Sequence, residues 1–186
     1  MAIQREFRGT GTQLKYNDVM FSLELLHLPI ENSALRAMWL INQANIPEVG
    51  DIPTIEEFNS LVKMSSHVIV VKNDEVTAGF IILMREKEDY HSLNYKFFTA
   101  NYDQFLYVDR VAIKDGFRRK GLGKMIYDEV FKLATENNID VCCEVNTLPR
   151  NDASLAFHAE FGFQEVGIKD YDDHSVVYLK SPVTSN

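Results

Sequence analysis

The stretch from Arg118 to Lys124, Arg-Arg-Lys-Gly-Leu-Gly-Lys, combines basic side chains with glycines. It follows an apolar run at 105–114 and opens a segment, Leu122–Asn137, whose apolar residues recur at helical spacing. A helix N-terminus presents N–H groups without internal acceptors and a partial positive charge, so it attracts anions. Gly121 and Gly123 let the backbone approach a phosphate closely. The pattern predicts a site for a compact phosphorylated ligand, although a solvated helix start would look similar.

Two familiar phosphate motifs do not match this stretch. The P-loop needs a lysine directly after its second glycine, and Leu122 follows Gly121 instead. The dinucleotide fingerprint G-x-G-x-x-G needs a third glycine, which is missing after Gly123. Neither motif explains the stretch.

Composition and charge narrow the classes of partner. The 186 residues, 46% of them hydrophobic, suit a single domain at 1–186 with a buried core. A formal net charge of −8 argues against a nucleic acid partner, which would need a broad basic face. The local basic stretch in an acidic chain suits a small anion better than a polymer.

The cysteines and the apolar runs indicate in which cellular compartment the protein resides. Cys142 and Cys143 are neighbours, and successive side chains on a strand point to opposite faces, so they cannot staple distant parts of the fold. The first residues lack the apolar run of a signal peptide, and the longest apolar stretch, 78–84, is too short to cross a bilayer. We expect a cytoplasmic protein without a membrane partner.

The spacing of apolar residues predicts alternating strands and helices. We expect strands at 19–28, 67–72, 76–85, 105–114, 139–145, 163–168 and 175–179. We expect helices at 34–44 with Ser33 as N-cap, at 54–63 with Thr54 as N-cap, at 122–137 and at 152–161. Residues up to Tyr16 indicate an irregular arm or short strand, and the aperiodic segment 87–104 indicates a loop near a ligand site. The second half is therefore β-α-β-α-β-β, with a parallel unit in a mostly antiparallel context.

Two segments carry a resemblance to a known family. Arg118-Arg119-Lys120-Gly121-Leu122-Gly123 resembles the acetyl-CoA signature (Q/R)-x-x-G-x-(G/A) of the GNAT superfamily. Residues 151–163 resemble its N-x-x-(A/S)-x-x-x-Y-x-x-x-G-F segment, and the stretches 107–111 and 143–146 are similar to a bacterial branch of predicted N-acetyltransferases. The resemblance covers 105–168 well and the first hundred residues only in element order. It implies an α/β fold with a mixed, largely antiparallel sheet, a splayed central parallel pair and flanking helices.

The same resemblance implies acetyl-CoA as the cofactor. Pantetheine would lie between the splayed strands and pair with backbone groups at Val111 and Ile113, and the pyrophosphate would lie on amides within 119–124. The residues assigned to the cofactor in this way are Val111, Ala112, Ile113, Arg118, Arg119, Lys120, Gly121, Leu122, Gly123, Lys124, Asn151, Ser154 and His158.

Acetyl transfer to an amine needs a base for the amine proton and an acid for the departing thiolate. His158 stands where many relatives have a tyrosine near the sulfur, so it is either that acid or a hydrogen-bonding partner of cofactor or backbone. Asp109 and Glu144 are candidate bases, because they lie amid apolar residues and burial raises a carboxyl pKa. Each has a structural alternative, with Arg110 or a backbone group as partner of Asp109 and Asn146 as partner of Glu144.

The sequence therefore predicts an N-acetyltransferase that joins acetyl-CoA and an amine, from a small molecule or a peptide, by direct transfer in a ternary complex. A backbone N–H near 111–113 would polarise the thioester carbonyl. One alternative is a non-catalytic acyl-CoA-binding regulatory protein, which the histidine in place of tyrosine favours. Another is an interaction domain whose basic turn binds some other phosphate compound. The histidines are not spaced like zinc ligands, so we expect no zinc site. The expected assembly is a homodimer.

Overall fold

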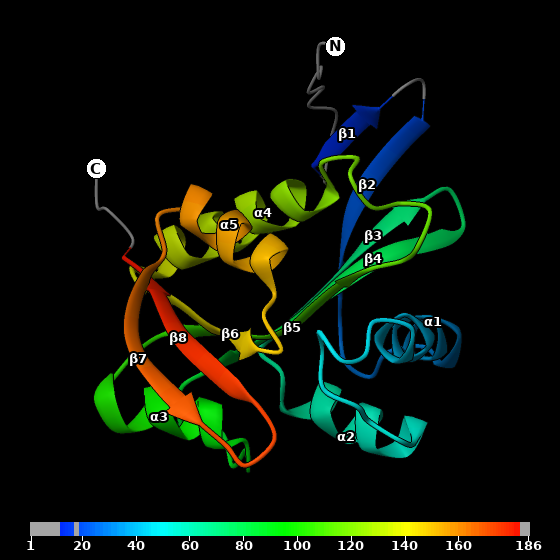
Figure 1. Ribbon diagram of the computed structural model, residues 1–186. Coiled ribbons are helices and arrows are strands. Elements are labelled where there is room, and N and C mark those ends of the chain that lie inside the picture. Colours follow the sequence, from blue (N-terminus) through cyan, green and yellow to red (C-terminus); the bar gives the residue numbers. More distant parts are fainter. Residues whose placement is uncertain (1–11, 17–18, 183–186) are drawn as a thin grey trace. The chain divides into compact units, whose positions relative to one another are not determined.

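The computed structural model describes residues 12–16 and 19–182. Their strands form one mixed sheet, and helices lie between strands along the chain (Figure 1). The strands are β1 (Gln13–Tyr16), β2 (Val19–Leu26), β3 (His67–Asn73), β4 (Val76–Arg85), β5 (Leu106–Ile113), β6 (Val141–Leu148), β7 (Gln164–Asp170) and β8 (Ser175–Ser181). The helices are α1 (Asn32–Gln43), α2 (Ile55–Met64), α3 (Leu93–Asn101), α4 (Leu122–Asn137) and α5 (Asp152–Glu160). Among the described residues, no helix is both long and apolar enough to cross a bilayer.

The strand order confirms the predicted fold class. The hydrogen-bonded order is β1-β2-β3-β4-β5-β6-β8-β7. β5 and β6 run parallel, with Leu106 opposite Val141 and Tyr107 opposite Cys142. The pairs β1–β2, β2–β3, β3–β4, β6–β8 and β7–β8 are antiparallel. The chain returns from β5 to its parallel neighbour through α4, the crossover that such a pair requires. The splay of the two strands beyond the paired residues stays a prediction.

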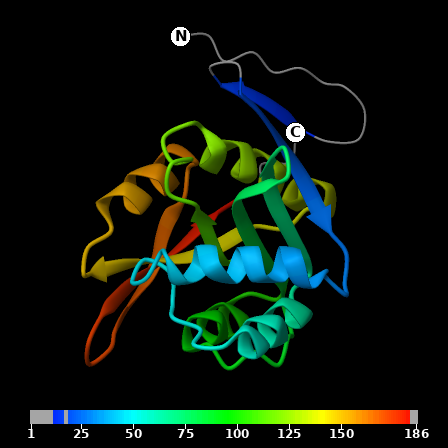
Figure 2. The same ribbon diagram turned by 90° about the vertical axis from the view of Figure 1, so that its right-hand side faces the viewer.

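The chain divides into two compact units, of which the first comprises Met1–Leu83 and Arg110–Val130. β3 and β4 are buried over most of their length and supply much of its core. Helices α1 and α2 lie beside each other (Figure 2). As predicted, α2 begins behind Thr54, whose hydroxyl accepts a hydrogen bond from the Glu57 N–H at 3.2 Å.

The second unit comprises Met84–Asp109 and Phe131–Asn186. Its β7–β8 hairpin joins β6 through β8. Helix α3 packs through Phe98, whose ring centre lies 6.1 Å from that of Phe105 and 5.7 Å from that of Tyr107. These buried rings fix α3 beside the first residues of β5, because aromatic contacts add to the area that they bury.

Two sequence expectations were wrong. The segment 87–104, expected to be a loop, contains helix α3, which begins behind Ser92 with its hydroxyl accepting from the Tyr95 N–H at 3.3 Å. Its buried side chains are only Tyr95 and Phe98, too few to produce a readable helical stripe. The helix expected at 34–44 begins at Asn32, so Ser33 lies inside it and is not its N-cap. The strand at 76–85 and the helix at 122–137 have the predicted ends, the other predicted elements are present with shifted ends, and residues 1–11 of the expected arm lie outside the described residues.

Candidate active site

In the first unit, the loop that leads from β5 into α4 has a backbone suited to an anion. Gly116, Arg119 and Gly121 have positive φ angles of 83°, 61° and 80°. Left-handed residues within a turn aim neighbouring N–H groups to one side and form a concave anion-binding nest. The left-handed conformation costs Arg119 about 1–2 kcal/mol relative to a right-handed one. Strain of this kind gathers at functional sites, where the surrounding structure holds it in place.

The start of α4 adds donors to this loop. A hydrogen bond from the Met125 N–H to the Gly121 carbonyl at 3.0 Å starts the helical ladder. The N–H groups of Leu122 and Gly123 therefore precede the ladder and point out of the helix end, where the helix dipole is positive. Lys124 adds an exposed ammonium that pairs with Asp128 at 2.7 Å. This donor set fits a diphosphate, the group that the resemblance assigned to 119–124.

The side chain of Arg118 anchors the same loop. Its guanidinium donates to Oδ1 of Asn45 at 2.8 Å and lies 3.3 Å from a carboxylate oxygen of Asp115. Asn45 is buried just beyond α1 and donates to the Ile41 carbonyl at 2.7 Å. The arginine therefore ties the loop to the end of α1, which keeps the neighbouring amides in place.

The end of β5 enters the loop in close contact with β4. A Cβ atom on Gly79 would lie 2.9 Å from the Ala112 carbonyl oxygen and 2.6 Å from Cδ1 of Ile113. The Lys114 N–H donates to the Ala78 carbonyl at 2.9 Å. Residues 111–113 are thus held firmly at the point where the chain leaves the sheet.

In the second unit, Glu144 on β6 is the acceptor of a polar network. Its Oε2 accepts a hydrogen bond from the Tyr107 hydroxyl at 2.7 Å, and its Oε1 accepts one from Nδ2 of Asn94 at 3.0 Å. The side-chain oxygen of Asn94, Oδ1, accepts hydrogen bonds from the hydroxyls of Tyr171 at 2.8 Å and Tyr178 at 3.1 Å. The partners of Glu144 are therefore these two side chains rather than the Asn146 considered from sequence.

The surroundings of Glu144 suit a general base. Burial raises its pKa to about 7, helped by the charge of Asp109, while the hydrogen bonds from Tyr107 and Asn94 act in the opposite direction. Burial and the neighbouring carboxylates also raise the pKa of Tyr107, so its hydroxyl stays protonated and keeps donating. A base titrating near neutral pH is well matched to accept a proton from an amine.

Asp109, the other candidate base, is half-buried on β5. Its charge opposes ionisation of both Glu144 and Tyr107. The side chain of Arg110, the partner considered from sequence, donates to Oδ1 of Asn42 at 2.7 Å and to the Gly50 carbonyl at 3.2 Å. Asp109 thus acts on the network around Glu144 through its negative charge, which raises the pKa of Glu144 and of Tyr107.

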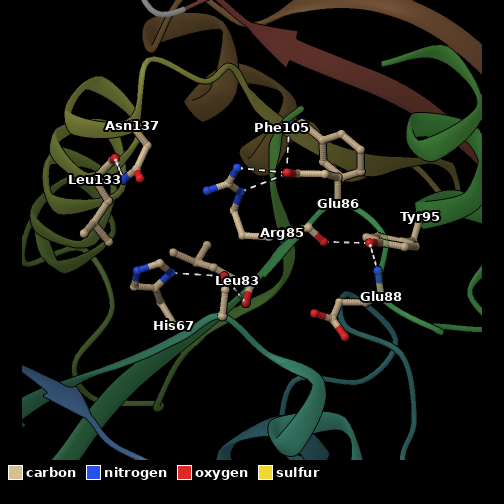
Figure 3. Close-up of polar contacts among 10 residues, drawn as sticks. His67, Leu83, Arg85, Glu86, Glu88, Tyr95, Phe105, Leu133 and Asn137 are labelled. Atoms are coloured by element: carbon tan, nitrogen blue, oxygen red, sulfur yellow. Dashed lines mark hydrogen bonds and ion pairs between the residues drawn. The ribbon is translucent and has the colours of Figure 1, made fainter. Parts of the chain in front are cut away.

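Helix α3 is fixed by contacts of Tyr95, the residue after Asn94, and Figure 3 shows these contacts. The Tyr95 hydroxyl donates to the Arg85 carbonyl at 2.6 Å and accepts from the Glu88 N–H at 2.9 Å. Glu86 pairs with the Arg85 guanidinium at 2.8 Å and accepts from the Phe105 N–H at 3.4 Å. The Tyr95 contacts join the helix to the end of β4, and Glu86 joins that end to Phe105, the residue before β5.

His158 lies on α5 and is almost fully buried, with 4% of its surface exposed. Its Nδ1 lies 2.7 Å from the Ser154 carbonyl oxygen and 3.2 Å from the Ser154 hydroxyl. Since a carbonyl only accepts, Nδ1 carries the proton in the neutral ring and Nε2 carries the lone pair. Burial lowers the pKa of His158, which favours this neutral form. Asn151 is the N-cap of α5, and its side chain accepts from the Ser154 N–H at 3.0 Å.

The two cysteines are packing residues in this arrangement. Both are free and buried on β6. Burial raises the pKa of each thiol, and a thiol held protonated is a poor nucleophile. The structure therefore gives no basis for a covalent acyl-enzyme at Cys142 or Cys143.

Sequence reasoning found Glu144 and Asp109 but missed Asn94, Tyr171 and Tyr178. Asn94 lay in the segment expected to be a loop, and the tyrosines lay in and after an acid-rich turn. The one available signal was the alternation on β5, which placed Tyr107 on the same face as Asp109. Which residues of a different strand or helix meet that face could not be inferred without the pairing of β6 with β8.

Comparison with known protein families identifies one family that this sequence matches. The sequence model of the Acetyltransferase (GNAT) family matches residues 34–163. Among curated protein sequences, none matches the chain at a significant level.

Solved structures share the fold at low sequence identity. The ribosomal-protein-S18-alanine N-acetyltransferase from Escherichia coli is 16% identical, with a TM-score of 0.64 over 88% of this chain and 96% of that one. FeeM, an N-acyl amino acid synthase from uncultured soil microbes, is 16% identical, with a TM-score of 0.65 over 89% and 93% of the two chains. Arabidopsis thaliana Naa50, in complex with the bisubstrate analogue CoA-Ac-MVNAL, is 13% identical, with a TM-score of 0.62 over 86% and 97%. The family match spans most of this chain and agrees with its fold, so the chain belongs to the acetyltransferase (GNAT) family.

Proposed function

We propose that the protein is an N-acetyltransferase that transfers the acetyl group of acetyl-CoA directly to an amine in a ternary complex. One observation carries this proposal: the Glu144 carboxylate is held by two donors and titrates near neutral pH. Family membership supplies the reaction type, in which an amine must lose a proton. The fold similarity is consistent with this reaction but does not identify the acceptor.

In this proposal Glu144 is the general base. With a pKa of about 7, its carboxylate is ionised in a large fraction of molecules at neutral pH, and it accepts a proton from the attacking amine. Tyr107 orients the carboxylate by donating to Oε2. The negative charge of Asp109 keeps the base strong enough for this task.

The role proposed for His158 is structural. A neutral ring with its proton on Nδ1 has no proton to donate from Nε2. Donation would need the charged ring, which burial disfavours. His158 and Asn151 thus stabilise α5 through their hydrogen bonds with Ser154, and Asn151, Ser154 and His158 stay proposed contacts of the cofactor.

The cofactor residues are proposed from the loop and the strand that precedes it. Acetyl-CoA, when bound, supplies the acetyl thioester. We assign its phosphates to the backbone of 118–124, because the left-handed residues and the helix end concentrate N–H groups there. Backbone groups of 111–113 remain the proposed partners of the pantetheine.

A binding and turnover assay tests the proposal. Thermal shifts are measured with CoA and acetyl-CoA on the wild type, Gly121→Glu and Glu144→Gln. A ligand at 100 times its dissociation constant adds about 2.7 kcal/mol of stability. We expect the shift in the wild type and in Glu144→Gln but not in Gly121→Glu. Release of the CoA thiol is then followed with amines that include peptide N-termini, because one structural neighbour is bound to a CoA–peptide analogue.

The outcomes separate the candidate functions. Turnover lost in Glu144→Gln with cofactor binding retained supports the base assignment. Binding without turnover of any amine selects the regulatory alternative, which the absence of a ready proton on His158 Nε2 favours. A wild type that binds neither CoA nor acetyl-CoA contradicts both.

We further propose that the whole chain acts as one catalytic domain, since the family match runs through both compact units. The free, neighbouring cysteines support a reducing compartment such as the cytoplasm. A homodimer is proposed on general grounds, and sedimentation of the purified protein measures it directly.

A further inference from the structure

The Asn94 side chain stands between the proposed base and a surface turn. Its amide nitrogen donates to Glu144, and its carbonyl oxygen accepts from Tyr171 and Tyr178. Because the ionised carboxylate only accepts hydrogen bonds, Glu144 fixes the amide nitrogen of Asn94 on its own side, and the amide oxygen is left to accept from the two tyrosine hydroxyls. A rotated Asn94 would place an oxygen against the ionised carboxylate and lose the hydrogen bond to Glu144.

The turn between β7 and β8 is the outer end of this chain of contacts. Tyr171 is its first residue, and the Tyr171 N–H donates to the His174 carbonyl at 2.8 Å. The Tyr171 ring stacks on that of His174, with centres 4.4 Å apart and planes 10° apart. The hydroxyl therefore reaches Asn94 from a turn with its own internal contacts.

The inner end is equally well fixed. Asn94 lies in the first turn of α3, and the next residue, Tyr95, is buried and hydrogen-bonded to the end of β4 (Figure 3). On β8, Tyr178 lies directly opposite Glu144 in the antiparallel pairing with β6. The Asn94 side-chain amide is thus held by Tyr178, the β8 residue opposite Glu144, and by Tyr171 of the turn.

We propose that Asn94 and Tyr171 are positioning residues for Glu144, which hold its carboxylate and link it to the turn between β7 and β8. This inference rests on the proposed role of Glu144 as general base. The residues act through Glu144 and need no contact with the substrate. Their effect is on the ionisation and orientation of the carboxylate.

A titration reads this effect directly, so every group around the carboxylate matters. The groups that act on Glu144 are Tyr107 and Asp109 from β5, Asn94 from α3, Tyr178 from β8 and the neighbouring Cys143, while Tyr171 from the turn acts through Asn94. Of these, Asn94 and Tyr107 donate to the charged form. Loss of the Asn94 donor must therefore raise the pKa of Glu144.

The experiment compares Asn94→Leu, Tyr171→Phe and Asn101→Leu with the wild type. Leucine keeps the approximate volume of asparagine and removes its donor, and phenylalanine keeps the ring of Tyr171 while removing its hydroxyl. Asn101 is the matched control, because it lies at the other end of α3 and donates to the Phe97 carbonyl within its own helix. The Glu144 carboxyl is titrated by 13C NMR, assigned with Glu144→Gln, and kcat/KM is measured against pH.

We expect the midpoint of the Glu144 titration and the acid limb of kcat/KM to move up by about one pH unit in Asn94→Leu. Tyr171→Phe should move both in the same direction by a smaller amount, and Asn101→Leu should move neither. An unmoved midpoint in both Asn94→Leu and Tyr171→Phe overturns the inference, including when activity falls. The NMR titration needs no turnover, so it stands apart from failure of the proposed function. That failure would appear as full activity in Glu144→Gln.

Discussion

The Tyr107 hydroxyl donates a 2.7 Å hydrogen bond to Oε2 of Glu144 across the parallel pair β5–β6. Tyr107 lies opposite Cys142 in this pairing, so its ring reaches toward the residue two positions further along β6. The contact joins a phenol that burial keeps protonated to a carboxyl that burial makes basic. Removal of the hydroxyl alone thus changes the base without removing it.

Tyr107→Phe should shift the pH dependence of activity. The lost donor stabilised the carboxylate, so the pKa of Glu144 rises and the acid limb of kcat/KM moves up by about one pH unit. Activity on the alkaline plateau should stay within a few-fold of the wild type. Tyr102→Phe is the control, because its ring lies 5.0 Å from the Lys180 ammonium and keeps that contact. A lower plateau with an unmoved limb would show that Tyr107 serves packing alone.

Glu144→Gln should change how stability depends on pH. The pKa of Glu144 is raised to about 7 in the folded protein from 4.5, so between these values the folded state holds a proton that the unfolded state has released. Wild-type stability therefore falls as pH rises through this window.

The glutamine variant does not titrate, so its stability relative to the wild type should rise between pH 4.5 and pH 8. The gain is at most about 3 kcal/mol, since one pKa unit is worth about 1.4 kcal/mol and partial exposure of Glu144 screens part of it. Urea unfolding at a series of pH values measures the difference. Glu136→Gln, which removes an exposed carboxylate from α4, is the control. A constant difference between wild type and Glu144→Gln at all pH values would contradict the raised pKa.

Local sequence signals sufficed wherever one segment carried its own pattern. Leu122–Asn137 was predicted with the ends that the structure shows, because its apolar stripe is long and its preceding glycines break the chain. Thr54 was recognised as an N-cap from the glutamate three residues later. Helix α3 carries only two buried residues on a short segment, so its pattern was too weak to be read.

The candidate site shows the same division. The phosphate-binding character of 118–124 is a local property of glycines and a helix start, and it was legible in the sequence. Glu144 could be named as a base, but its partners Asn94 and Tyr178 come from α3 and β8. Their contact depends on strand pairing over long sequence separation, which no local spacing encodes.

Gly79→Ala should destabilise the first unit. A Cβ at this position would lie 2.9 Å from the Ala112 carbonyl oxygen, so β4 and β5 must shift apart. We expect a loss of about 1–3 kcal/mol in the free energy of unfolding, the usual cost of overpacking. Gly50→Ala is the matched control, because a Cβ there meets nothing within 4 Å. Equal stability of the two variants in urea unfolding would contradict the close approach of the strands.

Gly121→Ala and Gly116→Ala together separate backbone strain from ligand binding. Both glycines have left-handed backbones, with φ of 80° and 83°. An added Cβ meets only Leu14, at 3.6 Å from Gly121, and nothing within 4 Å at Gly116. Each alanine should therefore lower the free energy of unfolding by a similar amount, about 1–2 kcal/mol, through backbone strain alone.

The two variants should differ in affinity for CoA, because Gly121 lies within the segment 118–124 to which the phosphates are assigned, whereas Gly116 belongs to the same loop but precedes that segment. Relaxation of its backbone toward the right-handed region would turn the neighbouring N–H groups away from a common centre. We expect calorimetry to show binding weakened at least tenfold in Gly121→Ala and changed less than threefold in Gly116→Ala. If both variants bind like the wild type, the phosphates do not lie on this loop. If both lose affinity equally, the loop acts through its overall fold rather than through the amides around Gly121.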